Sequence, residues 1–150
     1  MRAVIQRVKE ASVVIEEQTF SSIGPGLVVL AGFEDADTPQ TVERVCGKIV
    51  NMRIFSDSDG KMNLSVRDAG GELMAISQFT LYAATRKGNR PSFIRAARAE
   101  VSRPLYDAFV EKLGDLSGKP VTTGIFGADM KVALVNDGPV TIIIDTSYLE

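Results

Sequence analysis

The order of apolar patterns along the chain is the feature that most restricts its fold. Segments rich in Val and Ile that are typical of strands come first, and an apolar stripe at helical spacing follows over residues 42–50. Further strand patterns precede a second helical pattern over residues 92–113, and three more strands close the chain, over residues 120–125, 130–136 and 140–145. This order predicts an α/β fold, in which a single domain over residues 1–150 has mixed, barrel-like β-sheets and helices packed outside.

Turn and capping residues set the expected boundaries of these elements. Thr38 and Pro39 form a typical helix start. The Thr38 hydroxyl can cap the first turn, and proline suits the first helical position because a backbone N–H there has no partner within the helix. Pro104 is expected to break or kink the second helix, and Gly114 is expected to end it. The other expected strands cover residues 2–8, 11–16, 27–33, 61–66 and 72–79, of which 27–33 is apolar throughout, as in a strand covered on both faces.

The composition excludes several classes of function. The chain has no histidine, which excludes Ser-His-Asp and Cys-His catalysis. A formal net charge of −2 and a pI near 5.3 argue against binding of nucleic acid through bulk charge, although the end of a nucleic acid can still be recognised locally. The lone Cys46 lies among apolar residues at helical spacing, which predicts a core residue in a reducing cytoplasm. The first residues are too polar for a signal peptide, and no apolar run approaches the ~20 residues of a membrane helix, so no membrane contact is expected.

The usual metal and nucleotide motifs do not fit this sequence. Residues 57–60, Asp-Ser-Asp-Gly, resemble a calcium loop faintly but lack its later ligands, so a solvated turn is the better interpretation. Residues 124–127 are too short for a phosphate-binding loop and contain no lysine. With one cysteine and no histidine a tight zinc site is implausible, so neither a metal nor a cofactor is predicted.

The first candidate site is the end of the strand at residues 72–79. Backbone N–H groups at a strand end have lost their ladder partners and are suited to hold a developing oxyanion, and the hydroxyl of Thr80 can attack a carbonyl or orient a water. On the pattern alone, a plain strand end that carries Ser and Thr is the favoured alternative. The candidate residues are Ser77, Gln78, Phe79 and Thr80.

The second candidate site is Asn136-Asp137-Gly138-Pro139. A hairpin turn between strands 130–136 and 140–145 is the favoured interpretation of these residues. The alternative is a cis peptide bond at Gly138-Pro139, whose two carbonyls would then face the same way and bind an ammonium group.

These two segments, Ser77–Leu81 and Asn136–Thr141, together resemble the D-aminoacyl-tRNA deacylase (D-tyrosyl-tRNA deacylase) family. The similarity extends over essentially the whole chain and includes the segments 6–8, 87–93 and 126–130. Each motif alone is weak, but both signatures in order and at this separation are specific, and neither departs from the family pattern.

The resemblance implies an enzyme that cleaves the ester between a D-amino acid and the terminal ribose of tRNA, at the acceptor end. It implies a homodimer in which a cis Gly138-Pro139 enters the partner's active site and holds the substrate's ammonium group. Arg7 is then expected to support that turn, Phe126 and Met130 to line the pocket, and the amides of Phe79 and Thr80 to lie near the scissile carbonyl. A rigid main-chain clamp of this kind would reject L-amino acids by steric clash and admit glycine, so glycyl-tRNA is an expected second substrate.

The mechanism and the RNA contacts are further hypotheses. An unassisted threonine is a poor nucleophile, so we expect the substrate's ribose 2′-hydroxyl to assist hydrolysis. Two alternatives stay open, namely a small Thr-dependent esterase and a non-catalytic RNA-binding module. Positive charge between residues 86 and 103 is either a solvated surface or a rim that contacts tRNA phosphates, and the candidates for that rim are Arg86, Lys87 and Arg90.

Overall fold

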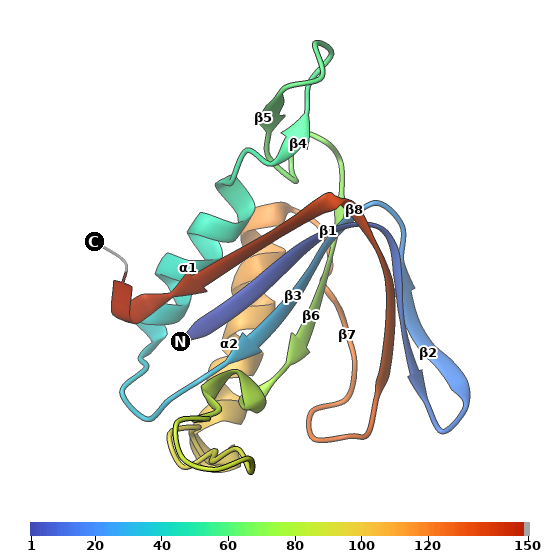
Figure 1. Ribbon diagram of the computed structural model, residues 1–150. Coiled ribbons are helices and arrows are strands. Elements are labelled where there is room, and N and C mark those ends of the chain that lie inside the picture. Colours follow the sequence, from blue (N-terminus) through green and yellow to red (C-terminus); the bar gives the residue numbers. More distant parts are fainter. Residues whose placement is uncertain (149–150) are drawn as a thin grey trace.

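A computed structural model describes residues 1–148, so the last two positions of the predicted domain, residues 149–150, lie outside the described residues. The elements form one sheet of six strands, a separate two-stranded hairpin and helices on one side (Figure 1). The strands are β1 (Arg2–Ile15), β2 (Gln18–Ile23), β3 (Gly26–Gly32), β4 (Phe55–Ser56), β5 (Met62–Leu64), β6 (Glu72–Ser77), β7 (Thr122–Thr123) and β8 (Lys131–Asp145). The helices are α1 (Pro39–Asn51) and α2 (Ala99–Ser117), with short 3₁₀ helices η1 (Phe79–Tyr82) and η2 (Thr146–Tyr148).

The sheet curls around the long strand β1. The first half of β1 pairs antiparallel with β3 and its second half with β2, while β8 runs antiparallel along the other edge over both halves. β3, β6 and β7 are parallel neighbours. The outer strands β2 and β7 meet where Ser21 Oγ donates a hydrogen bond to the Thr123 carbonyl oxygen at 2.7 Å. This contact nearly closes the sheet, and the predicted barrel-like α/β domain is confirmed.

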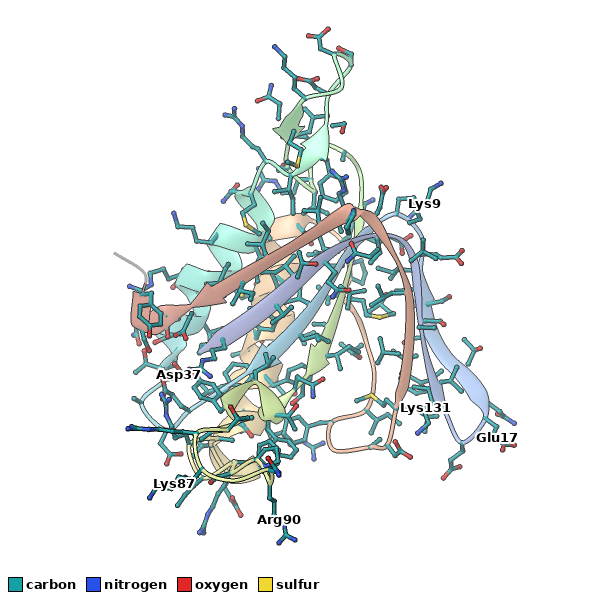
Figure 2. The ribbon with its side chains drawn as sticks, viewed as in Figure 1. Lys9, Glu17, Asp37, Lys87, Arg90 and Lys131 are labelled. Atoms are coloured by element: carbon teal, nitrogen blue, oxygen red, sulfur yellow. The ribbon has the colours of Figure 1, made fainter. Side chains whose placement is uncertain are left out.

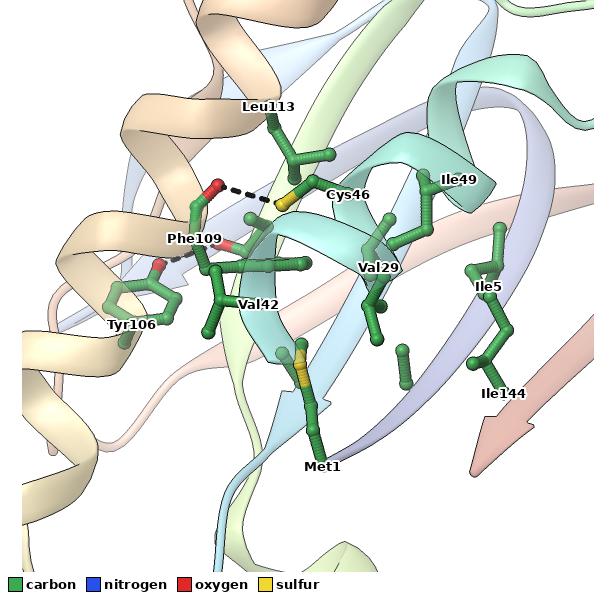
Figure 3. Close-up of a cluster of buried hydrophobic side chains, with 14 of the residues drawn as sticks. Met1, Ile5, Val29, Val42, Cys46, Ile49, Tyr106, Phe109, Leu113 and Ile144 are labelled. Atoms are coloured by element: carbon green, nitrogen blue, oxygen red, sulfur yellow. Dashed lines mark hydrogen bonds between the residues drawn. The ribbon is translucent and has the colours of Figure 1, made fainter. Parts of the chain in front are cut away.

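Two apolar clusters hold these layers together. The larger lies between the sheet and the two helices and contains Ile5, Val29, Ile49 and Phe109 (Figure 3). The smaller fills the inside of the curled sheet, with residues from β1, β2, β3 and β6. Strand β3 contributes to both clusters, which confirms that its continuous apolar run is covered on both faces.

Helix α1 forms as its sequence predicts. The Thr38 hydroxyl accepts a hydrogen bond from the Thr41 backbone N–H at 3.2 Å, and Pro39 occupies the first helical position. The apolar stripe is fully buried, and it comprises Val42, Val45, Cys46, Ile49 and Val50. Cys46 is therefore a core residue, and its Sγ lies 3.6 Å from the Phe109 carbonyl oxygen (Figure 3).

The prediction for the second helix was wrong at both ends. Residues 92–98 are not helical, and the helix continues past Pro104, because the missing N–H falls near the exposed start of α2 and removes only one bond. Gly114 lies within the helix. The helix ends instead at Gly118, which has a φ of +77° and whose N–H donates to the Gly114 carbonyl oxygen.

The prediction of a hairpin turn at residues 136–139 was also wrong. Strands 130–136 and 140–145 are the two halves of β8, and strands 2–8 and 11–16 are the two halves of β1. Gln6 pairs with Thr141 and Val8 with Asn136, so residues 137–140 leave the ladder opposite a single residue, Arg7. The turn-forming residues therefore make a bulge in a continuing strand, because both halves of β8 find the same antiparallel partner.

Other expected strands are shorter than predicted. Only Met62–Leu64 of residues 61–66 and Thr122–Thr123 of residues 120–125 are paired, and β6 ends at Ser77 rather than at residue 79. Asp57 accepts hydrogen bonds from the Asp59 and Lys61 backbone N–H groups, so residues 57–60 form the expected turn. Neither α1 nor α2, nor any other helix within residues 1–148, combines the length and the hydropathy that crossing a bilayer requires.

Candidate active site

The carboxyl end of β6 is where the first predicted site lies. Ser77 pairs with Ala31 of β3, and the Gln78 N–H donates to the Ala31 carbonyl oxygen at 2.7 Å. The chain then turns out of the sheet into η1. Phe79 and Thr80 begin this 3₁₀ helix, and neither of their backbone N–H groups donates a hydrogen bond to any residue from 1 to 148. Two free donors therefore lie side by side at the strand end.

A cavity of about 380 Å³ opens beside these donors. Its walls come from the ends of β3 and β6, the start of α2 and the segment 126–130. The structure brings together five of the predicted site residues here, and they are Ser77, Gln78, Phe79, Phe126 and Met130. Thr80 does not line the cavity, and its Oγ1 accepts a hydrogen bond from the Gln78 side-chain amide.

The wall opposite η1 is held by tight packing. The Phe126 ring lies 5.8 Å from the Tyr106 ring, and the Arg103 guanidinium lies over Phe126 at 5.7 Å. A Cβ atom on Gly124 would lie 2.3 Å from Met130 Sδ, so this glycine allows the methionine to reach the cavity. The close approach of Gly124 to Met130 had no signature in the sequence, because it joins residues across a loop.

The second predicted site lies in the bulge of β8. The Gly138-Pro139 peptide bond is cis, Gly138 has a φ of +131°, and both residues are exposed. Arg7 fixes the bulge, since its Nε donates to the Asp137 carbonyl oxygen at 3.0 Å and its Nη1 to the Ile54 carbonyl oxygen at 2.6 Å. The Val140 N–H donates to Asn136 Oδ1 at 3.1 Å, which closes the loop of the bulge.

Within one chain the two predicted sites are separate. Neither Gly138 nor Pro139 nor Arg7 lines the cavity beside η1. Figure 1 shows β8 bending at the end of the sheet opposite to the tip of the β6 arrow, where η1 follows. The entry of Gly138-Pro139 into a partner's active site therefore stays a prediction.

A basic segment lies next to the cavity. Residues 84–98 form a surface loop closed by a bridge between Ala84 and Ser92, and Lys87 and Arg90 extend from it (Figure 2). The residues predicted to contact RNA, Arg86, Lys87 and Arg90, are exposed and make no ion pair with any residue from 1 to 148. The Phe93 ring of this loop packs edge-on against Phe79, at 5.3 Å between centroids. The helix predicted over residues 92–113 included Phe93, so this contact was not predicted.

The cavity offers main-chain donors rather than titrating groups. Asp129 is its one titratable lining residue among those described, and its side chain is 88% exposed. No cluster of three metal-ligating side chains occurs within residues 1–148. Such a site favours reactions in which preorganised N–H groups stabilise an oxyanion.

Comparison with known proteins identifies relatives over essentially the full chain. The sequence model of the family described as D-Tyr-tRNA(Tyr) deacylase matches residues 4–145. Proteins named D-aminoacyl-tRNA deacylase from Dechloromonas aromatica and Parabacteroides distasonis are each 57% identical over 150 residues, which is 100% of this chain and of theirs. The solved structure of a protein described as c-Myc DNA Unwinding Element Binding Protein is 40% identical, with a TM-score of 0.91 over 97% of this chain and 99% of that chain.

Proposed function

Because the chain belongs to the D-Tyr-tRNA(Tyr) deacylase family and is a D-aminoacyl-tRNA deacylase, we propose that it cleaves the ester in the cavity beside η1. The products are free tRNA and a D-amino acid. The observation that carries this assignment is the pair of free N–H groups of Phe79 and Thr80 beside a cavity of about 380 Å³. Charged tRNA belongs to translation, so we place the reaction in the cytoplasm.

The main-chain donors supply the catalytic stabilisation in this proposal. When water attacks the ester carbonyl, negative charge develops on its oxygen, and the N–H groups of Phe79 and Thr80 stabilise it. Removing one donor of this kind typically slows a reaction by about 10²–10³-fold. An aminoacyl ester is already reactive, so stabilisation and positioning are sufficient without a histidine.

The substrate's ribose 2′-hydroxyl assists the attack. The Thr80 hydroxyl already accepts a hydrogen bond from the Gln78 side chain, and Asp129, the titratable residue of the cavity, is exposed at its edge. A threonine without a base is a poor nucleophile. The neighbouring hydroxyl of the RNA is therefore the better placed group.

A second copy of the chain completes the site in this proposal. The ammonium group of the substrate needs acceptors, and the exposed bulge at Gly138 and Pro139 presents main-chain carbonyls that take no part in the β1–β8 ladder. Arg7 holds the bulge through the Asp137 carbonyl, which makes it a rigid projection. We therefore propose a homodimer in which each Gly138-Pro139 enters the cavity of the partner.

Rigid backbone around the bound aminoacyl group explains why the D enantiomer is selected. With the ammonium and the carbonyl of the substrate fixed, a D side chain points toward solvent, whereas an L side chain meets the backbone of the clamp. Selection is by steric exclusion. Glycine has no side chain to exclude, so glycyl-tRNA is also a substrate.

Hydrolysis assays test the activity and its selectivity. We expect release of D-amino acid from several D-aminoacyl-tRNAs, release of glycine from glycyl-tRNA, and no reaction with the matching L-aminoacyl-tRNA. Equal turnover of both enantiomers would contradict the clamp, and inertness toward glycyl-tRNA would contradict steric exclusion. Equal rates on simple D-amino-acid esters would indicate an esterase that does not need RNA.

Subunit mixing tests the shared site. Ala97→Phe fills the cavity, where Ala97 is a buried lining residue, and Pro139→Ala alters the clamp. Each variant alone is expected to be inactive. After subunit exchange a mixed dimer holds one intact cavity and one intact clamp facing each other, so part of the activity returns. No recovery in demonstrably mixed dimers would contradict a clamp supplied by the partner.

A further inference from the structure

The 3₁₀ helix η1 is anchored through its last residue, Tyr82. The Tyr82 side chain is 1% exposed, and its hydroxyl lies 3.3 Å from Glu34 Oε1, to which it donates a hydrogen bond. Burial raises the pKa of the Tyr82 hydroxyl, and the nearby carboxylates of Asp37 and Glu34 raise it further. The phenol therefore remains a neutral donor.

Two guanidinium groups lie over the Tyr82 ring. The Arg2 group lies 4.6 Å from the ring centroid and the Arg95 group 5.7 Å from it, which are distances for cation–π attraction. Arg2 Nη1 also donates to the Leu81 carbonyl oxygen at 2.7 Å, and its Nε forms an ion pair with Asp145 at 2.9 Å. Arg2 thus holds both the ring and the backbone of η1 from the first strand of the sheet.

Arg95 reaches Tyr82 from the surface loop of residues 84–98 (the basic loop). Its Nη2 lies 3.6 Å from Glu34 Oε2, so Glu34 contacts both the tyrosine hydroxyl and Arg95. The same loop touches η1 through the contact of Phe93 with Phe79, and near the end of the loop the Ala97 N–H donates a hydrogen bond to the Phe33 carbonyl oxygen at 2.9 Å. The loop that carries the free cations is therefore fastened to the helix that carries the free N–H groups.

We propose that Arg2 and Arg95 are positioning residues for the deacylation: they hold Tyr82 and thereby orient the Phe79–Thr80 backbone at the cavity. Arg95 also makes this orientation depend on the placement of the basic loop, so binding of RNA phosphates by the loop favours the productive geometry of η1. This inference rests on the proposed role of the Phe79 and Thr80 amides.

Because Arg95 is largely exposed, an experiment can distinguish a positioning role for it from a purely structural one. Its side chain is 53% exposed, and ion pairs of such exposure contribute little to stability. A displacement of the amides by a fraction of an ångström nevertheless changes the rate strongly, since misplacement of about 1 Å can cost about 10²-fold. Loss of Arg95 should therefore affect kcat far more than the melting temperature.

The test compares Arg95→Gln with Arg95→Lys, Tyr82→Phe and a control, Arg44→Gln, which removes one exposed positive charge on α1 outside this network. Each protein is assayed on D-aminoacyl-tRNA and on the short ester D-aminoacyl-adenosine, which lacks the tRNA body. We expect Arg95→Gln to lower kcat on both substrates by about tenfold or more with little change of KM on the short ester. Arg95→Lys should recover part of the loss, Tyr82→Phe should lose less than Arg95→Gln, and Arg44→Gln should behave as wild type.

Two results would overturn the inference. If Arg95→Gln raised KM for the tRNA but left kcat on the short ester unchanged, Arg95 would be an RNA contact only. If it lowered the melting temperature but left kcat unchanged below that temperature, its role would be structural.

A measurement that does not depend on catalysis tests this inference separately from the proposed function. Hydrogen exchange of the Leu81 and Ala83 amides, which donate to the Gln78 and Thr80 carbonyl oxygens of η1, should accelerate in Arg95→Gln and in Arg2→Gln but not in Arg44→Gln when it is measured by NMR. Unchanged exchange in both network variants would refute the positioning role even if the enzyme were active. Failure of the wild-type protein to cleave either substrate would instead refute the proposed function and leave this exchange result to decide the inference.

Discussion

Arg7 lies opposite the bulge of β8, and its Nε donates a hydrogen bond to the Asp137 carbonyl oxygen at 3.0 Å. The Arg7 side chain is only 11% exposed, and its second hydrogen bond goes to the Ile54 carbonyl oxygen, at the base of the β4–β5 hairpin. One side chain from the middle of β1 therefore fixes a segment of β8 that no ladder bond holds.

Replacing Arg7 tests this dependence. Arg7→Ala leaves two carbonyl oxygens without their donor, so we expect the free energy of unfolding to fall by about 2 kcal/mol and the deacylase activity to fall strongly. Arg7→Lys keeps the charge but cannot span both carbonyls, and it should recover only part of each loss. Chemical denaturation and hydrolysis of D-aminoacyl-tRNA measure the two effects. Wild-type stability and activity in Arg7→Ala would contradict the role of this residue.

Gly138 is predicted to tolerate no side chain. An added Cβ would lie 2.8 Å from Val140 Cγ2 and 3.0 Å from Arg7 Nη2, at a φ of +131°. Gly60→Ala is a suitable control, because Gly60 also has a positive φ, +77°, but open space around it. The control should cost about 1 kcal/mol, and Gly138→Ala should cost more and lower activity. Equal unfolding midpoints for the two variants would show that crowding at the bulge is unimportant.

The backbone of Thr80, rather than its side chain, is predicted to matter for catalysis. Thr80→Ala removes the hydroxyl and should keep most of the activity. Thr80→Pro removes the N–H at the start of η1, and a loss of about 10²–10³-fold in kcat is expected. Melting curves of both variants control for folding. Activity at background in Thr80→Ala would instead support a side-chain nucleophile.

The ribose of the substrate supplies an independent test of the mechanism. A D-aminoacyl-tRNA that ends in 2′-deoxyadenosine lacks the proposed helper hydroxyl, and we expect its single-turnover rate to fall sharply while its affinity changes little. The substrate with the ordinary 3′-terminal adenosine is the control. Undiminished turnover of the deoxy substrate would remove the ribose from the mechanism.

Charge reversal in the basic loop should weaken RNA binding. Lys87→Glu with Arg90→Glu replaces two exposed cations of the loop whose Phe93 packs against Phe79, so Kd for tRNA should rise by about tenfold or more and its dependence on salt should flatten. Lys9→Glu, on the distant part of the surface seen in Figure 2, controls for net charge. Identical binding across a salt titration would reject the loop as a phosphate contact.

Cys46 is predicted to be unreactive in the native protein. Burial raises the pKa of its thiol to about 12, so the reactive thiolate is scarce at pH 8. A chromogenic disulfide reagent should label the protein only after denaturant is added. Rapid labelling of the native protein at pH 8 would show that the core around α1 opens easily.

The sequence by itself determined the features that depend on neighbours along the chain. The start of α1 at Thr38 and Pro39 and its buried stripe follow from capping chemistry and helical spacing. The run at residues 27–33 indicated a strand covered on both faces, and the two signature segments indicated the family. For α1 and for the strand at residues 27–33, the residues that decide the outcome lie within a few positions of one another.

Only the tertiary structure decided the features that depend on distant partners. Asn136–Pro139 has the composition of a hairpin turn, yet it forms a bulge because β1 offers one continuous edge to both halves of β8. Residues 92–98 have a helical pattern, yet Phe93 leaves it to pack on Phe79. Turns, bulges and helix starts draw on the same local preferences, and the choice between them is made by pairing and burial against segments far away in the chain.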